Sequence, residues 1–115
     1  MKGSLDLIQG TLDTLILKAL SWGPMHGYQV STWIQGASGK ELQIEEGTLY
    51  PALHRMQERG LVEAEWGLSE NNRRAKFYRL TAAGREALSE KTAVWERYAR
   101  AVGRILTAVR PEPTG

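Results

Sequence analysis

The sequence contains no cysteine, no long apolar run and little net charge. Without cysteine there is no disulfide framework and no thiolate chemistry, which fits a reducing cytoplasm, where we expect the protein to be located. The most apolar stretch, 12–20, is short and is interrupted by Asp13 and Lys18, so it cannot span a bilayer. The 115 residues suffice for one domain of ordinary size. These absences exclude a disulfide-stapled secreted domain and predict no membrane partner.

The groupings typical of catalytic and metal sites are missing as well. The two histidines, His26 and His54, have no cysteine and no carboxylate pair at metal-ligand spacing nearby. No nucleophile lies in a recognisable frame, and no glycine loop is suited to holding phosphates. We therefore predict that the protein is not an enzyme and holds neither a metal nor a cofactor.

The net charge of +2 hides an uneven distribution. Residues 71–79 carry Arg73, Arg74, Lys76 and Arg79 with no acidic residue among them. A local basic patch attracts phosphates even when the total charge is small. This segment is therefore a candidate for contact with nucleic acid.

Residues 45–60 have the pattern of an amphipathic helix. Four apolar residues fall at i, i+3, i+4 and i+7 and so share one face: Leu49, Ala52, Leu53 and Met56. The other sides collect groups that can read base edges or grip phosphates in a major groove: Thr48, Tyr50, His54 and Arg55. We interpret the segment as a recognition helix; the alternative is an ordinary helix with a solvated polar face.

Pro51 leaves the start of this helix open. If the helix starts near Glu46, Pro51 cannot donate to the Gly47 carbonyl and a bend is expected. If it starts at Tyr50, Pro51 is a normal first-turn residue. The sequence does not decide between the two.

The segments after this helix predict a β-hairpin. Gly60 is suited to ending the helix, and residues 61–66 alternate apolar and acidic residues as a half-buried strand does. A polar loop at 67–74 leads to a second strand at 75–80. Helix, strand, basic loop and strand in this order describe a winged helix.

Two helices are predicted before the recognition helix. Apolar residues from Leu5 to Leu20 predict a first helix that is apolar on more than one side, with Ser4 as its cap and Gly10 as a weak interior point. A second helix follows the break at Gly23 and Pro24, and residues 42–44 are a candidate short strand. Tyr28, near the start of the second helix, either reaches a phosphate or packs on the core.

Thr81 is a good cap for a last helix predicted over 82–109. From Trp95 on, its apolar residues recur every three or four positions: Trp95, Tyr98, Val102, Ile105 and Val109. Leu88 extends the series backwards, and Lys91 interrupts it. A domain of about 80 residues cannot cover so long a stripe, so we predict pairing with a second copy; folding back as a monomer is the alternative. The predicted organisation is a DNA-binding domain at 1–80, a dimerisation helix at 81–110 and a disordered tail at 111–115.

Three segments resemble the PadR family of bacterial transcriptional regulators: GPMHGYQV (23–30), GTLYPALHRMQERGLVEAEW (47–66) and NNRRAKFYRLTAAG (71–84). The resemblance implies a mainly α fold with a small β-wing, in which a winged helix-turn-helix carries a long C-terminal dimerisation helix. It also implies a homodimer that represses by binding a pseudo-palindromic operator in double-stranded DNA. Two sets of residues are implied to contact that DNA: in the major groove Thr48, Tyr50, Pro51, His54 and Arg55, and in the wing Arg73, Arg74 and Lys76.

Only one helix follows Thr81, so the chain resembles the short subfamily, and a phenolic acid effector is not implied. Several short members bind flat apolar compounds between paired tryptophans, and Trp95 occupies the matching place. A planar hydrophobic effector beside Trp95 is therefore one hypothesis, and simple filling of the dimer core by Trp95 is the other. Short members often act near transporter genes, which suggests a transport or efflux operon. A competing interpretation is a winged helix used as a protein-interaction module.

Overall fold

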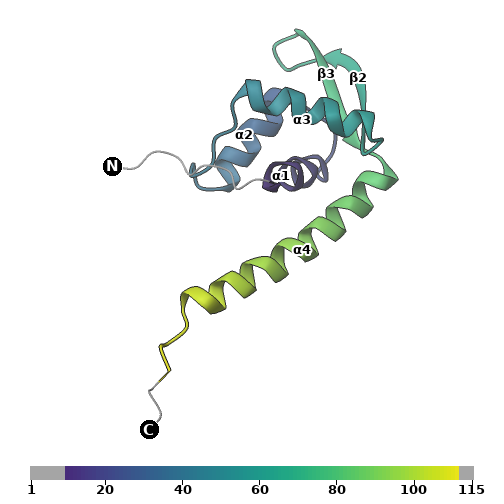
Figure 1. The fold of residues 1–115 in the computed structure, drawn as a ribbon. Helices are drawn as coiled ribbons and strands as arrows, with labels where there is room; N and C mark the ends of the chain where they lie inside the picture. Colours follow the sequence, from purple (N-terminus) through teal and green to yellow (C-terminus); the bar gives the residue numbers. More distant parts are fainter. Residues whose placement is uncertain (1–9, 112–115) are drawn as a thin grey trace.

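The computed structural model describes residues 10–111 as four helices and a three-stranded antiparallel sheet (Figure 1). The elements are α1 (Thr11–Leu20), β1 (Met25–His26), α2 (Gly27–Ala37), α3 (Glu46–Glu58), β2 (Val62–Leu68), β3 (Arg74–Leu80) and α4 (Ala82–Leu106). Strand β3 lies between β1 and β2. The predicted fold is confirmed: it is mainly helical, with the β2–β3 hairpin as the wing.

The core lies where α1, α2 and α3 meet the inner end of the sheet. The four apolar residues predicted to share one face of α3 are all at most 1% exposed. They pack with Ile16 and Leu20 of α1 and with Val30 and Ile34 of α2. Burying each such side chain stabilises the fold by about 1.5–3 kcal/mol. The opposite face of α3 is therefore left outward.

Helix α1 begins later than the sequence suggested. Gly10 precedes the helix with φ of 88°, so it is not an interior weak point; it takes up the left-handed conformation that glycine tolerates. The predicted cap Ser4 and the apolar Leu5 lie outside the described residues. Leu17 lies beside the apolar stripe that contains Ile16 and Leu20, and it too is fully buried within its own chain. The two-sided helix is thus covered by its own domain.

The third strand of the sheet comes from a segment that the sequence did not mark as a strand. Met25 pairs with Tyr78, and His26 pairs with Phe77. The stretch 42–44, predicted as a short strand, forms only an isolated bridge at Leu42. Leu42 and Ile44 instead pack against the core as a covering loop.

The wing extends further than predicted. Its strands pair from Val62 with Leu80 to Leu68 with Arg74, so residues 67, 68 and 74 belong to strands and the loop shrinks to 69–73. Trp66 was predicted to be half-buried, but it is 56% exposed because the hairpin projects past the core at this point. Its side chain lies on the same side of the sheet as the buried Val62, as the strand alternation predicts.

Helix α4 projects away from the rest of the molecule (Figure 1). The molecule measures 72 × 37 × 21 Å with a radius of gyration of 17.7 Å, whereas a compact domain of 100 residues has about 13 Å. The helix ends at Leu106, so Val109 lies beyond it. Leu88, predicted as a dimerisation residue, packs against the core of its own domain. Residues 112–115 of the predicted tail lie outside the described residues.

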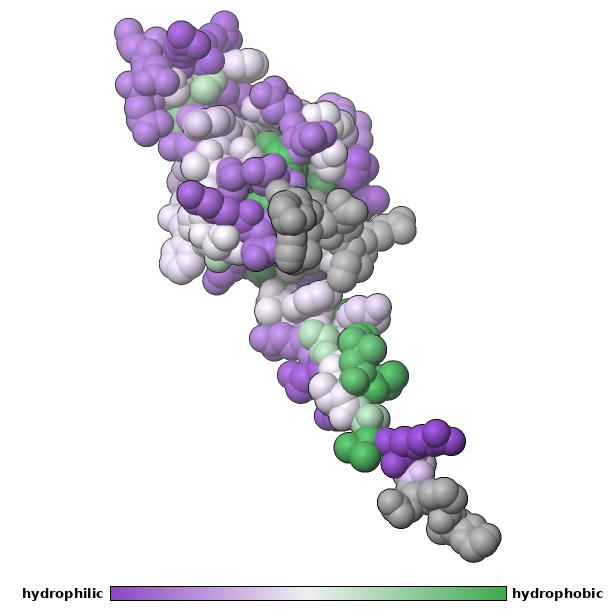
Figure 2. Space-filling view, turned by 90° about the vertical axis from the view of Figure 1, so that its left-hand side faces the viewer, coloured by the Kyte–Doolittle hydropathy of each residue, from purple (hydrophilic) through white to green (hydrophobic). Residues whose placement is uncertain are grey.

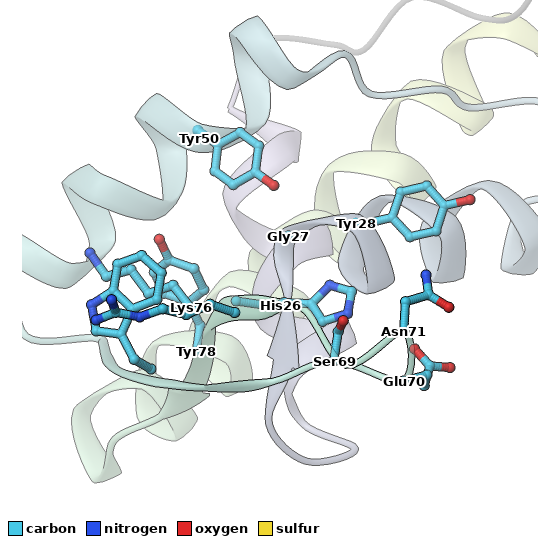
Figure 3. Close-up of a pocket in the computed structure, with 12 residues that line it drawn as sticks. His26, Gly27, Tyr28, Tyr50, Ser69, Glu70, Asn71, Lys76 and Tyr78 are labelled. Atoms are coloured by element: carbon cyan, nitrogen blue, oxygen red, sulfur yellow. The ribbon is translucent and has the colours of Figure 1, made fainter.

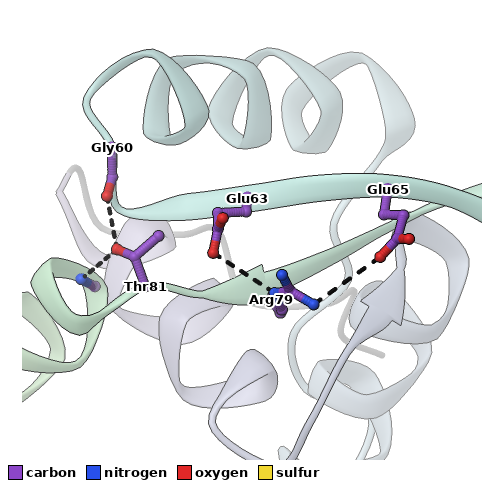
Figure 4. Close-up of polar contacts among 6 residues, drawn as sticks. Gly60, Glu63, Glu65, Arg79 and Thr81 are labelled. Carbon is purple, nitrogen blue, oxygen red and sulfur yellow. Dashed lines mark hydrogen bonds and ion pairs between the residues drawn. The ribbon is translucent and has the colours of Figure 1, made fainter.

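A compact joint connects the end of α3 to the start of α4 (Figure 4). The Thr81 hydroxyl donates to the Gly60 carbonyl at 2.6 Å and accepts from the Gly84 amide at 3.0 Å, which confirms Thr81 as the cap. The Thr81 amide donates to the Leu61 carbonyl at 3.1 Å. A side chain at Gly84 would overlap that same carbonyl oxygen. The direction of α4 is therefore fixed by bonds to Gly60 and Leu61, shortly after the end of α3.

Candidate nucleic-acid interface

Helix α3 starts at Glu46, which decides the position of Pro51. Pro51 is the sixth residue of the helix and lies inside it. Because proline has no N–H, the Gly47 carbonyl loses its usual partner one turn earlier. Gly47 is exposed and has open space where a side chain would be. The first turn of α3 thus presents accessible backbone at the surface.

All five predicted recognition residues lie on the exposed side of α3: Thr48, Tyr50, Pro51, His54 and Arg55. His54 Nε2 lies 3.4 Å from a carboxylate oxygen of Glu58, one turn further along. Arg55 has no carboxylate within ion-pair distance in residues 10–111. The guanidinium of Arg55 is therefore free to bind an external acceptor.

Tyr50 differs from the other four because its ring packs against α2. A Cβ atom placed on Gly27 would lie 2.5 Å from the Tyr50 phenolic oxygen and 2.6 Å from two ring carbons. Burial, and then the negative charge of Glu46, raise the pKa of Tyr50 above its ordinary value. The phenol therefore keeps its proton at neutral pH and can donate a hydrogen bond.

The start of α2 is held by a reciprocal cap. His26 Nδ1 accepts from the Gln29 amide at 3.3 Å, and the His26 amide donates to the Gln29 side chain at 3.0 Å. The next residue but one, Tyr28, is 72% exposed, with its ring centroid 6.5 Å from that of His26. Of the two alternatives for Tyr28, packing on the core is thus wrong.

The two sides of the wing carry different charges. On the outer side, Arg79 lies 3.6 Å from Glu63 and 3.9 Å from Glu65, so its charge is compensated (Figure 4). On the other side, Arg74 lies over the Trp66 ring at 4.5 Å, and Lys76 lies over the Tyr78 ring at 5.8 Å. Within the described ranges neither of these two cations has a carboxylate partner. Strand alternation has separated the compensated cation from the free ones.

A cleft of about 520 Å³ separates the wing from the starts of α2 and α3 (Figure 3). Its walls come from four segments: residues 26–28, Tyr50 of α3, the wing loop 69–71 and the strand residues Trp66, Arg74, Ala75, Lys76 and Tyr78. Figure 3 shows the Tyr50 hydroxyl directed towards Gly27. Arg73 and Arg55 do not line the cleft. Of the predicted contact residues, the cleft therefore brings together Tyr28, Tyr50, Arg74 and Lys76.

Two negative findings apply to residues 10–111. No cluster of histidine and acidic side chains is arranged to hold a metal ion. None of the helices combines the length and apolar character that a bilayer crossing requires.

The projecting helix α4 carries an exposed apolar band (Figure 2). Its members include Val94, Trp95, Tyr98, Ile105 and Leu106, which are 40–78% exposed. Figure 2 shows hydrophobic surface along one side of the projecting helix, whereas much of the rest of the visible face is hydrophilic. An apolar band of this length on a soluble helix marks an interaction surface.

Comparison with known proteins identifies the family. The sequence profile of the transcriptional regulator PadR-like family matches residues 16–90. The chain belongs to this family. It is 39% identical over 71 residues to the transcriptional regulator Rv3488 of Mycobacterium tuberculosis, covering 61% of this chain and 65% of that protein.

Solved structures agree with this assignment. A transcriptional regulator from Clostridium thermocellum superposes with a TM-score of 0.76 at 31% identity, covering 84% of this chain and 94% of that one. A PadR-like transcriptional regulator from Bacillus cereus superposes with a TM-score of 0.75 at 30% identity, covering 88% and 96%. The protein is thus a PadR-family transcriptional regulator with the winged-helix fold of DNA-binding regulators.

Two residues of this PadR-family surface were not singled out from the sequence. Gly27 makes room for Tyr50, and His26 caps α2. The spacing of His26 and Gln29 is that of a capping box, but histidine is not among the usual caps. The contact between Gly27 and Tyr50 joins residues 23 positions apart, and no local pattern encodes it.

Proposed function

We propose that this PadR-family protein is a dimeric repressor that binds a pseudo-palindromic operator. Helix α3 enters the major groove with Thr48, Pro51, His54 and Arg55, and Tyr28 contacts a phosphate beside it. Arg73, Arg74 and Lys76 of the wing contact phosphates or the adjacent minor groove. The observation that supports this proposal is that Tyr50, on the exposed side of α3, lines the same cleft as the uncompensated wing cations Arg74 and Lys76.

The alternative of a protein-interaction module requires an apolar patch on the exposed side of α3. That side instead consists mainly of polar groups, and its neighbour is the basic wing. Exposed apolar side chains also occur singly on the wing, at Trp66 and Leu68, but they form a band along α4, which we assign to pairing between two copies of the chain. DNA binding and self-association thus use different parts of the molecule.

Selection of bound fragments from genomic DNA at moderate salt tests the proposal. We expect enrichment of a pseudo-palindrome whose half-sites are one helical turn apart, about 34 Å. Transport or efflux genes are the targets we expect beside it. A pool that stays unenriched after repeated rounds, together with no shift of random duplex DNA at low salt, would overturn the proposal.

Removing both arginines at the end of the wing should weaken binding to every DNA sequence. Each phosphate contact contributes about 0.9 to the slope of log affinity against log salt. Arg73→Ala with Arg74→Ala should therefore reduce the slope by about 1.8 and the affinity by roughly 30-fold at about 0.15 M salt. Binding isotherms at several salt concentrations measure both quantities.

The control for this pair is Arg79→Gln with Arg104→Gln, which removes the same charge elsewhere. Arg79 is already paired with two glutamates, and Arg104 lies in the last turn of α4. An equal loss in the control pair would show that net charge, rather than the wing, governs binding.

Arg55→Ala should lower the preference for the operator over random DNA. A bidentate contact from arginine to a guanine edge is worth about 1–3 kcal/mol of discrimination. We therefore expect the operator to lose roughly 5- to 150-fold in affinity while random DNA loses little. Competition assays with both duplexes measure the ratio. Equal losses on the two duplexes would assign Arg55 to the phosphate backbone.

Trp95 is the proposed wall of an effector site between two paired α4 helices. It is 40% exposed in the single chain, and its ring lies 6.1 Å from that of Tyr98. A planar hydrophobic or cationic dye should therefore quench tryptophan fluorescence in the dimer. The quenching should disappear in Trp95→Ala, whereas Trp22→Ala should retain it. No quenching across a panel of dyes would leave Trp95 as a packing residue only.

A further inference from the structure

Tyr50 does not have the geometry of a side chain that reads base edges. Its ring lies against the backbone of α2 at Gly27, where a single methyl group would collide with it. Side chains that read bases must extend from the helix into the groove. The Tyr50 ring instead bridges α3 to the start of α2. Its position is therefore fixed by the protein, not by a base pair.

The phenolic oxygen of Tyr50 belongs to the cleft that separates the wing from α2. Arg74 and Lys76 line the same cleft and lack carboxylate partners among residues 10–111. The first turn of α2 contains no acidic residue, so the positive end of its dipole still attracts anions, although the Gln29 amide is taken by His26 Nδ1. Glu70 lines the cleft at the wing loop and Glu46 lies near Tyr50; these are the acids opposing that attraction.

The groups in the cleft suit a phosphate oxygen better than a base edge. The guanidinium of Arg74, the ammonium of Lys76 and the hydroxyls of Tyr28 and Tyr50 can all donate hydrogen bonds. The first two also carry positive charge. Phosphate oxygens accept such bonds, and charge-assisted bonds are the stronger kind. A volume of about 520 Å³ is also in the range of sites that enclose small groups.

We propose that this cleft binds one phosphodiester of the operator strand, and that Gly27 is a positioning residue that seats Tyr50 for this contact. The inference rests on the proposed DNA-binding function. Under this proposal Tyr50 contacts the DNA phosphate backbone and does not read a base edge in the major groove. Specificity then rests on Arg55 and its neighbours on α3.

The first test uses Tyr50→Phe, which keeps the ring on Gly27 and removes only the hydroxyl. Loss of one hydrogen bond to a charged phosphate should weaken the operator and random DNA alike, by roughly 10- to 150-fold. The ratio of the two affinities should not change. A fall in the operator affinity alone would overturn the inference, because a base contact behaves in that way.

The second test replaces single phosphates of each half-site by neutral methylphosphonates. In the wild-type protein, replacing the one phosphate that lies in the cleft should lower the affinity for DNA several-fold. At that linkage the further loss from Tyr50→Phe should vanish, because the accepting charge is already gone. Additive losses at every linkage would contradict a phosphodiester in the cleft.

The role of Gly27 is tested with a matched glycine of the same helix. Gly27→Ala should displace Tyr50 and weaken both DNA classes by at least 10-fold, whereas Gly36→Ala has open space and should leave binding unchanged. In a Tyr50→Ala background, Gly27→Ala should cause no further loss. A loss that persists in that background would show that Gly27 acts independently of Tyr50. Absence of DNA binding in the wild-type protein would instead contradict the proposed function itself.

Discussion

Replacing Val102 and Ile105 of α4 by aspartate should convert the protein to monomers and lower operator affinity by 100-fold or more. Ile105 is 74% exposed in the single chain and Val102 lies one turn before it on the same band. Two carboxylates in a paired apolar seam would be desolvated without partners, which is strongly unfavourable. A dimer that holds two half-sites gains about 10²–10⁴ over one half-site alone, and this gain would be lost.

Sedimentation equilibrium and operator titration measure the two effects. Ala93→Asp with Arg97→Ala is the control, since it makes the same change in net charge on the opposite side of the helix. The control should remain dimeric and keep its affinity. An aspartate variant that sediments as a dimer would show that the apolar band of α4 is not the pairing surface.

Gly84→Ala should be among the most destabilising single methyl additions in this chain. The added Cβ would overlap the Leu61 carbonyl oxygen and lie 3.2 Å from a Leu80 methyl group. The neighbour is backbone, and that carbonyl also accepts from the Thr81 amide, so it cannot simply move aside. We expect a loss of about 3 kcal/mol in the free energy of unfolding, at the upper end of overpacking costs.

Urea unfolding followed by circular dichroism measures this loss. Gly36→Ala is the comparison, because the same change in α2 meets nothing within 4 Å. Alanine is favoured over glycine inside a helix, so that variant should gain up to about 1 kcal/mol. Equal stability of the two variants would mean that the joint between Leu61 and α4 yields easily.

The sequence was most informative where burial follows a regular period. The stripe of α3 from Leu49 to Met56 is buried as the spacing predicts, and so is the inner end of β2 at Val62. Thr81 caps α4 because a hydroxyl at that position has only one useful local role. In each case the information lies within a few neighbouring residues, so a pattern can carry it.

The predictions that failed concern the limits of elements and contacts between distant residues. Burial of Trp66 depends on how far the hairpin projects beyond the core, which no alternation reveals. Strand β1 has two residues, too few for any period to show, and it exists because β3 offers it an edge. Leu88 continues the apolar series of α4, yet it packs against the core of its own domain and is not part of the exposed band.

The candidate site shows the same division. The exposed side of α3 and the basic wing were both predicted from composition and spacing. The cleft between them was not, because Tyr50 meets Gly27 only after α2 and α3 have packed. The side chains that would touch DNA were therefore visible in the sequence, whereas the spaces between them arise from tertiary structure.

The joint at Thr81 has a consequence for operator spacing. If two α4 helices are fixed by pairing, each domain turns on a pivot at the Thr81 joint, and the packing of Leu88 on the core resists that turn. The 13 residues of α3 extend about 20 Å from this pivot. A turn of about 5° would move the far end of each α3 by nearly 2 Å, and the two movements together match the rise of one base pair, about 3.4 Å. A few degrees at one threonine would thus suffice to adapt the repressor to a half-site separation longer or shorter by one step.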